Sequence, residues 1–209
     1  MIIQLKPTTT DEEKKDILQK VKTLDYKTTE VKTQEGIYIV GIGKKEFDLR
    51  QLGHMNGISD IHRVSDDYKL VSRKWKVGRT HIDLGDGVII GNGSLSIMAG
   101  PCSIENEDQV QQTIDHLVAN NVRIMRGGVF KPRSSPYAFR GMGVDGLKMW
   151  YRLARKAGNK IISEVMQVSQ IEAMYDYVDI FQVGARNTQN FNLLDELGRV
   201  DKAVMFKRG

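Results

Sequence analysis

Basic side chains follow several short apolar segments of this chain, each where a strand is expected to end. Arg126, Arg186 and Lys207 stand at three such points. The carboxyl ends of parallel strands meet at one edge of a sheet or barrel, so these cations are expected to converge. Guanidinium groups match carboxylate and phosphate oxygens, and lysine adds a point charge. The sequence therefore predicts a pocket for a small polyanion, although each residue taken alone is equally consistent with a solvated surface charge.

A second group of polar side chains lies in one predicted loop, residues 130–136. It contains Lys131, Arg133 and the hydroxyl of Ser134, on a backbone that Pro132 and a second proline stiffen. Two cations and hydroxyl donors on a stiff backbone suit a phosphate group. An ordinary polar loop is the alternative interpretation.

The single cysteine, Cys102, follows a Gly-Pro turn at the end of the first apolar segment of this region. A lone cysteine forms no internal disulfide, which favours a reducing, cytoplasmic compartment. Its thiolate could bind a metal such as Mn, Fe, Co or Zn, but a metal site needs three or four ligands and no companion is visible. A buried, small apolar residue is the alternative interpretation of Cys102.

The first 65 residues are expected to form one small domain. Apolar periodicity and turn residues predict strands at residues 2–5, 27–32, 37–42 and 58–64, and helices at residues 11–23 and 48–55. This βαββαβ order is that of a ferredoxin-like α+β domain.

From residue 66 the pattern changes. Residues 66–93 are predicted to be a polar linker and a barrel-capping hairpin with tight glycine turns. Beyond them lie predicted strands at residues 95–100, 123–126, 160–164, 180–183 and 203–207, and helices at residues 107–119, 146–157, 168–175 and 189–197. Repeated strand-helix units predict a parallel sheet, and polar strand ends favour a barrel. The expected fold class is therefore α/β, a ferredoxin-like domain followed, in residues 94–209, by the first half of a TIM (β/α)8 barrel.

Composition excludes two other classes of protein. The formal net charge of +5 comes from basic residues that are scattered among acidic ones, with no basic run longer than a short pair. The seven tyrosines, six phenylalanines and two tryptophans form no stacking array among clustered basic residues. We therefore expect no nucleic-acid partner. The apolar runs are far shorter than the roughly 20 residues that span a bilayer, so we expect no membrane insertion.

Taken together, the motifs resemble the type I-beta 3-deoxy-arabino-heptulosonate-7-phosphate (DAHP) synthases, including those with a ferredoxin-like N-terminal domain. The motifs are Ala99-Gly100-Pro101-Cys102-Ser103, Arg126-Gly127-Gly128, Lys131-Pro132-Arg133-Ser134-Ser135-Pro136-Tyr137, Gly184-Ala185-Arg186-Asn187 and Phe206-Lys207-Arg208-Gly209. The Lys-Pro-Arg-Ser loop separates them from the related keto-deoxy-octulosonate-phosphate synthases, in which an Ala-Asn-Arg-Ser-type loop is expected.

The resemblance implies a transferase that condenses phosphoenolpyruvate with erythrose 4-phosphate and opens the shikimate pathway of aromatic amino acid biosynthesis. It implies a divalent metal with Cys102 as one ligand, and a water molecule oriented by Glu164 and Lys207. The residues implied to hold phosphoenolpyruvate are Arg126, Lys131, Arg186 and Lys207. The residues implied to hold erythrose 4-phosphate are Lys131, Arg133 and Ser134, in the loop that contains Pro132. Lys131, Glu164 and Lys207 are thus the expected catalytic residues.

The resemblance also implies an incomplete barrel. The chain is expected to end after the fifth strand, about halfway through the roughly 250 residues of a usual eight-unit barrel. The remaining metal ligands of the family belong to later strands, so these 209 residues alone are expected to lack activity. The alternative function is an aromatic amino acid-sensing or assembly module, in which the N-terminal domain binds phenylalanine or tyrosine. We expect a homo-oligomer in either case.

Overall fold

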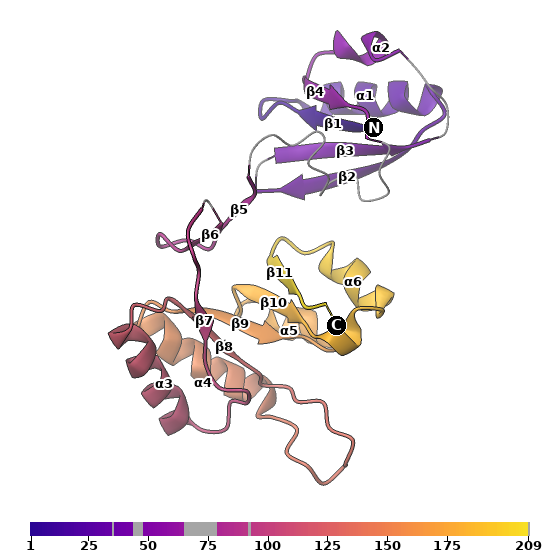
Figure 1. Cartoon of the computed structure of the whole chain (residues 1–209). Coiled ribbons are helices and arrows are strands. Elements are labelled where there is room, and N and C mark those ends of the chain that lie inside the picture. The colour runs from indigo at the N-terminus through magenta and orange to yellow at the C-terminus, as the bar shows by residue number, and fades with distance from the viewer. Residues whose placement is uncertain (35, 44–47, 65–78, 92, 209) are drawn as a thin grey trace. The chain divides into compact units, whose positions relative to one another are not determined.

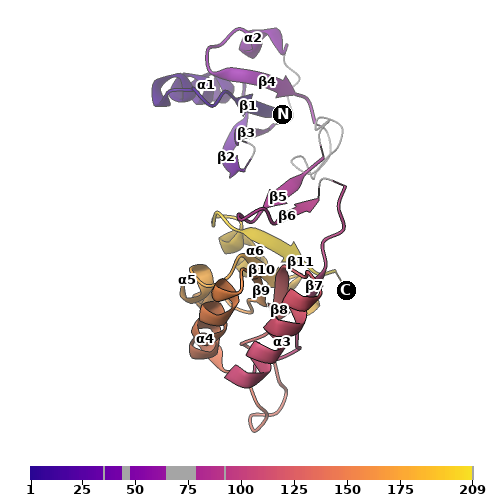
Figure 2. The ribbon, with the colours of Figure 1, turned by 90° about the vertical axis from the view of Figure 1, so that its left-hand side faces the viewer.

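The computed structural model describes residues 1–34, 36–43, 48–64, 79–91 and 93–208 (Figures 1 and 2). The chain divides into two compact units, Met1–Arg79 and Thr80–Gly209. Residues 65–78, which include most of the predicted polar linker, lie outside the described residues. So do Glu35, between the strands predicted at residues 27–32 and 37–42, and Asn92 of the predicted capping hairpin. Among the described residues, no helix has both the length and the apolar character needed to cross a membrane.

The first unit is a four-stranded antiparallel sheet with two helices. Its elements are β1 (Ile2–Leu5), α1 (Asp11–Thr23), β2 (Lys27–Thr33), β3 (Gly36–Ile42), α2 (Arg50–Gly53) and β4 (Ile58–His62). The strands lie in the order β2-β3-β1-β4, and all pairs are antiparallel. Buried side chains of both helices, such as Ile17 and Leu52, pack with Ile3 and Ile39 of the sheet. The helices therefore share one core with one face of the sheet.

Local sequence explains why α1 matches its prediction and α2 does not. Thr10 caps α1 in a capping box with Glu13, and Ile17 and Val21 lie on its buried stripe. By contrast, α2 has four residues instead of the predicted eight, and Leu52 is its only buried residue. One apolar anchor gives little reason for a longer helix, because short helices depend on packing. β4 likewise ends at His62, two residues earlier than predicted.

The second unit is built on a five-stranded parallel sheet with the order β11-β10-β9-β8-β7. Its strands are β7 (Met98–Ala99), β8 (Ile124–Gly127), β9 (Lys160–Glu164), β10 (Ile180–Val183) and β11 (Ala203–Phe206). Its helices are α3 (Glu107–Ala119), α4 (Gly143–Lys156), α5 (Ser169–Tyr175) and α6 (Phe191–Leu197). The prediction of five parallel strands joined by helices is therefore confirmed.

The largest error in the predicted strands concerns the first of them. β7 has two residues instead of six, and among the described strands it pairs with β8 alone, through Met98 opposite Ile124 and Ala99 opposite Met125. Leu95, at the start of the predicted strand, is 89% exposed. An apolar run forms a strand only where the sheet offers a partner, and the described residues include no strand partner for residues 95–97.

The two faces of the sheet are covered differently. Met125, Ile161 and Phe181 face the helices in one large core. On the opposite face, Ile124, Ile162 and Ile180 pack against Val88, which lies in the turn of a short hairpin made by β5 (His81–Asp83) and β6 (Ile89–Gly91). We call the face with Ile124, Ile162 and Ile180 the inner face. The predicted hairpin is thus present, with two strands of three residues each, and it covers part of the inner face.

Candidate functional site

Parallel strands bring the predicted site residues to one edge of the sheet. Arg126 lies in β8, Glu164 is the last residue of β9, and Cys102 follows β7. Arg186 lies in a short 3-10 helix directly after β10, and Lys207 directly follows β11. Because all five strands run in the same direction, these positions lie at the carboxyl edge of the sheet, where parallel α/β folds place ligands.

The pleat decides which face these side chains use. Successive residues of a strand point to opposite faces, so Arg126 shares the face of Ile124, and Glu164 shares the face of Ile162. Both therefore lie on the inner face, opposite the helices. Gln182, which follows Ile180 by two residues, lies on the same face and is buried. Glu164 and Gln182 thus form a polar pair on the part of the inner face nearest the carboxyl edge, and Arg126 lies on the same face in β8.

Cys102, Arg126 and Lys131 form one cluster of contacts. The Lys131 ammonium donates to the backbone oxygen of Cys102 at 2.8 Å and lies 3.2 Å from its Sγ. Arg126 Nη1 donates to the backbone oxygen of Pro101 at 3.2 Å. Lys131, by hydrogen bonding and charge, and to a smaller extent Arg126 hold the pKa of the exposed Cys102 thiol below its ordinary value. The cluster therefore favours a thiolate at this edge.

A glycine makes this approach possible. Gly100 has a φ of +148°, and a Cβ there would lie 2.1 Å from the backbone oxygen of Arg126. Any larger residue would push the segment that carries Cys102 away from β8. The glycine of the Gly-Pro-Cys motif is therefore explained by the packing of two strand ends.

The loop between β8 and α4 carries the other predicted phosphate ligands, and Figure 1 shows it reaching away from the sheet. Arg133 and Ser134 are exposed, and the Arg133 side chain donates to the backbone oxygen of Phe139 at 3.4 Å. Pro132 is partly buried beside them. Within the described part of the chain, no hydrogen bond joins Arg133 or Ser134 to the cluster around Lys131. The structure thus brings Lys131 to Cys102 and leaves Arg133 and Ser134 further along the loop.

Glu164 is held by the neighbouring strand β10. The Gln182 side chain donates to its carboxylate at 3.4 Å, and the carboxylate also lies against the bare Cα of Gly184. Arg186 and Lys207 are exposed, and the Lys207 backbone N–H donates to the oxygen of Val183 at 3.0 Å. Gln182 was not among the site residues predicted from the sequence. The signal that could have found it was a lone polar residue in an apolar strand, at the spacing of the inner face.

Within the described residues, the cations of the carboxyl edge have no carboxylate partners. In the described residues, no carboxylate lies within salt-bridge distance of any cation of this set: Arg126, Lys131, Arg133, Arg186 and Lys207. Uncompensated cations at one edge create a positive potential that attracts anions. The arrangement therefore suits a small ligand with several negative charges, as the sequence predicted for it.

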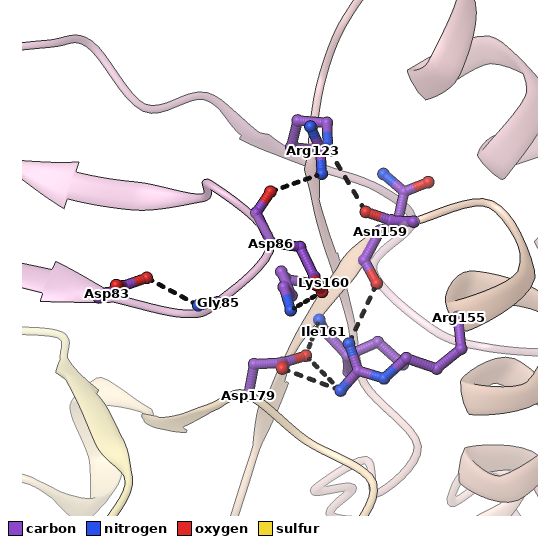
Figure 3. A network of polar contacts seen from close by, with 10 residues as sticks. Asp83, Gly85, Asp86, Arg123, Arg155, Asn159, Lys160, Ile161 and Asp179 are labelled. Carbon is purple, nitrogen blue, oxygen red and sulfur yellow. Dashed lines mark hydrogen bonds and ion pairs between the residues drawn. The ribbon is translucent and has the colours of Figure 1, made fainter.

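Two cations at the opposite, amino edge of the sheet, Arg155 and Lys160, are paired with carboxylates (Figure 3). Lys160 at the start of β9 lies 2.7 Å from the Asp86 carboxylate in the β5–β6 turn. Arg155 donates to both carboxylate oxygens of Asp179, at 2.8 and 3.0 Å, and the Ile161 N–H donates to the same group at 2.6 Å. These residues form a structural network, and the sequence alone predicted no role for them.

The residues described do not make a metal site by themselves. No group of three or more His, Cys, Asp or Glu side chains gathers anywhere in the described ranges. Cys102 offers one thiolate ligand, whereas metals of the expected kind need three or four protein ligands.

Comparisons with known proteins show what this chain is similar to. Residues 75–209 match the model of the family described as "DAHP synthetase I family". The chain is 38% identical to phospho-2-dehydro-3-deoxyheptonate aldolase of Thermotoga maritima over 210 residues, which span all of this chain and 62% of that protein. It is 32% identical over 135 residues to 2-dehydro-3-deoxyphosphooctonate aldolase of Syntrophotalea carbinolica, covering 61% of this chain and 49% of that protein.

The fold agrees as well. The crystal structure of the Thermotoga maritima DAHP synthase superposes with a TM-score of 0.67 and 37% identity, over all of this chain and 61% of that one. A truncated form of the Thermotoga maritima enzyme matches 67% of this chain with a TM-score of 0.59. The 209 residues therefore span less than two thirds of the length of these relatives. With the family model matching well over half of its residues, the chain belongs to the DAHP synthetase I family.

Proposed function

We propose that this chain supplies the phosphoenolpyruvate-binding part of a DAHP synthase, the transferase that opens the shikimate pathway. One observation carries the proposal: the cations of the carboxyl edge are uncompensated within the described residues and accompany a single carboxylate, Glu164, on the inner face. Family membership and the likeness to the Thermotoga maritima DAHP synthase support the reaction. Phosphoenolpyruvate, with a carboxylate and a phosphate, is a ligand that such an edge suits.

The proposed reaction conserves every atom of phosphoenolpyruvate, erythrose 4-phosphate and water. A bond forms between C3 of phosphoenolpyruvate and the aldehyde carbon of erythrose 4-phosphate. Water adds its oxygen at C2, and the bond from C2 to the phosphate oxygen breaks, which leaves a ketone at C2. One proton of the water ends on the new hydroxyl group, and the other leaves with inorganic phosphate.

The residues divide these tasks by position. In this proposal Arg126, Lys131, Arg186 and Lys207 bind phosphoenolpyruvate and absorb charge as the phosphate leaves. Lys131, Arg133 and Ser134 bind the phosphate of erythrose 4-phosphate, with Pro132 stiffening the loop. Glu164 and Lys207 orient the attacking water, and Glu164 accepts a proton from it. Cys102 remains as one candidate ligand of a divalent metal.

The same proposal assigns a domain to each part of the chain. We assign residues 1–65 to a ferredoxin-like regulatory domain, supported by the βαββαβ order and the β2-β3-β1-β4 sheet. We assign residues 66–93 to a linker and capping hairpin, and residues 94–209 to the first five strands of a TIM barrel, supported by the parallel sheet. We also propose that phenylalanine or tyrosine regulates the protein, that it forms a homo-oligomer and that it is cytoplasmic.

Ligand binding tests the proposal most directly. Calorimetry at low ionic strength should show phosphoenolpyruvate binding to this chain, weakened about tenfold or more in Arg186→Ala because one charged contact is lost. Arg152→Ala is the matched control, since Arg152 is an exposed arginine of α4 that pairs with Glu107 and is not one of the proposed ligand-binding cations. Equal affinity of the wild type and Arg186→Ala would remove Arg186 from the site.

Product formation tests the reaction itself. The complete polypeptide that contains these residues should release phosphate and form DAHP from phosphoenolpyruvate and erythrose 4-phosphate in the presence of manganese. Binding of phenylalanine or tyrosine without any binding of phosphoenolpyruvate would favour the sensing module instead.

A further inference from the structure

Gln182 is a polar residue in the otherwise apolar strand β10. It is 5% exposed, and Ile180, Phe181 and Val183 around it are buried. Burying an amide is unfavourable unless it finds a hydrogen-bond partner. Its partner is Glu164, which lies directly opposite it in the register of β9 and β10. The amide Nε2 donates to Glu164 Oε2 at 3.4 Å, the long end of the range, as is common for catalytic groups without bound substrate.

Gly184 makes room for the other oxygen of the same carboxylate. A Cβ built on Gly184 would lie 2.1 Å from Glu164 Oε1. The backbone there has a φ of −69°, which any residue adopts, so backbone conformation does not require a glycine. The glycine is explained instead by the position of the Glu164 carboxylate. Gln182 and Gly184, two positions apart along the chain, therefore contact the two oxygens of one carboxylate.

The choice of a neutral donor matters at an edge so rich in cations. No lysine or arginine of the described residues lies within salt-bridge distance of Glu164. A cation would neutralise the carboxylate and occupy its lone pairs, whereas an amide fixes its direction and leaves its charge and remaining lone pairs available. Such a carboxylate suits a group that must orient water and accept a proton.

From these contacts we infer that Gln182 is a positioning residue for the water-orienting carboxylate of Glu164, and that Gly184 leaves the space that this carboxylate occupies. We call the position that Gln182 and Gly184 form together the seat of Glu164. The inference rests on the proposed function, because it gives Glu164 its task there. Gln182 itself touches neither substrate nor water; it acts by holding the carboxylate in one rotamer. Such preorganisation should affect turnover and not substrate affinity.

Two substitutions test the seat in opposite ways. Gln182→Met keeps the length of the side chain and removes the amide, whereas Gly184→Ala keeps the amide and pushes Glu164 aside. In the complete polypeptide, each should lower kcat for DAHP formation about tenfold and change the KM for phosphoenolpyruvate less than about twofold. Gln170→Met is the control, because Gln170 is a buried glutamine of α5 whose Oε1 accepts from the Met166 N–H at 2.9 Å.

Either of two results would overturn the inference. One is a kcat of Gln182→Met within about twofold of the wild type or equal to that of the Gln170→Met control. The other is a change confined to KM. A Gly184→Ala variant with wild-type kcat would remove Gly184 from the seat and contradict the steric argument.

A measurement without turnover separates this inference from the proposed function. The side-chain amide signals of Gln182 in 15N NMR spectra should shift in Glu164→Gln and stay unchanged in Glu172→Gln, an α5 control. If the wild type makes no DAHP, the proposed function fails, and the amide signals still decide whether Gln182 holds Glu164. Signals of Gln182 that do not respond to Glu164→Gln would show that the contact is absent in solution.

Discussion

The two edges of the five-stranded sheet carry cations in opposite surroundings. At the amino edge, Lys160 is buried and contacts Asp86, and Arg155 is clamped by Asp179 (Figure 3). At the carboxyl edge, Arg186 and the other cations of the site contact no carboxylate among the described residues. Lysine and arginine side chains thus form ion pairs at the amino edge, whereas at the carboxyl edge they leave a net positive charge.

The difference separates structural from functional charge. A paired, half-buried ion stabilises the fold only in good geometry, and its loss leaves a charge without a partner. Several uncompensated cations gathered together gain nothing from the fold, so their mutual repulsion has to be offset elsewhere. The comparison therefore predicts that substitutions at the amino edge lower stability, whereas those at the carboxyl edge lower ligand binding.

The largest expected effect is at the amino edge. Asp179→Ala removes the bidentate partner of Arg155 and the acceptor of the Ile161 N–H. We expect the free energy of unfolding to fall by about 3 kcal/mol, because a half-buried guanidinium is left unpaired. Denaturant unfolding measures this. The control is Glu107→Ala, which breaks the exposed pair with Arg152 and should cost less than about 1 kcal/mol. Similar losses in both variants would contradict the comparison.

The second effect concerns the carboxyl edge. The double variant Arg186→Ala and Lys207→Ala should unfold within about 0.5 kcal/mol of the wild type without ligand, because both side chains are exposed and contact no carboxylate of the described residues. Phosphoenolpyruvate should raise the melting temperature of the wild type and raise that of the variant far less. A variant that is strongly destabilised without ligand would show that these cations are structural.

A smaller effect should follow acidification at the amino edge. The hydrogen bond and charge of Lys160 hold the pKa of Asp86 below its ordinary value in the folded protein. The contact therefore stabilises the fold above the pKa that Asp86 has when unfolded, and this stabilisation is lost as the pH falls through the lower, folded pKa. Amide exchange by itself slows as the pH falls, so protection factors, which correct for the intrinsic exchange rate, are the quantity to compare. The protection factors of β5 and β6 should decrease on acidification. In Asp86→Asn they should be lower already at neutral pH and depend less on pH, and identical profiles would contradict the pairing.

The smallest effect concerns the thiol of the carboxyl edge. Because Lys131 holds the pKa of Cys102 below its ordinary value, alkylation of metal-free protein by iodoacetamide should reach half its maximal rate at a lower pH than for a free cysteine. In Lys131→Met the midpoint should move upward. An unchanged midpoint would mean that Lys131 does not contact the thiol in solution. Lys148→Met, a substitution in α4, is the control for the loss of one positive charge.

Local sequence determined much of this protein. The bounds of α1, α3, β9 and β10 match their predictions, because capping residues and apolar periodicity act within a few positions of the chain. The positions of Arg126 and Glu164 at strand ends also followed from the sequence, since parallel strands must share an edge. The short motifs at these strand ends resembled those of the DAHP synthases, and the family match confirms that resemblance.

Only the tertiary structure decided which distant residues meet. Asp86 contacts Lys160 across 74 positions of the chain, and Gln182 meets Glu164 only because β9 and β10 pair in one register. A shift of one residue in that register would turn Gln182 away from Glu164, since side chains alternate between faces. The short β7 has the same cause, because a strand extends only as far as a partner does. Periodicity within a segment is local information, whereas register and partner choice depend on the whole sheet.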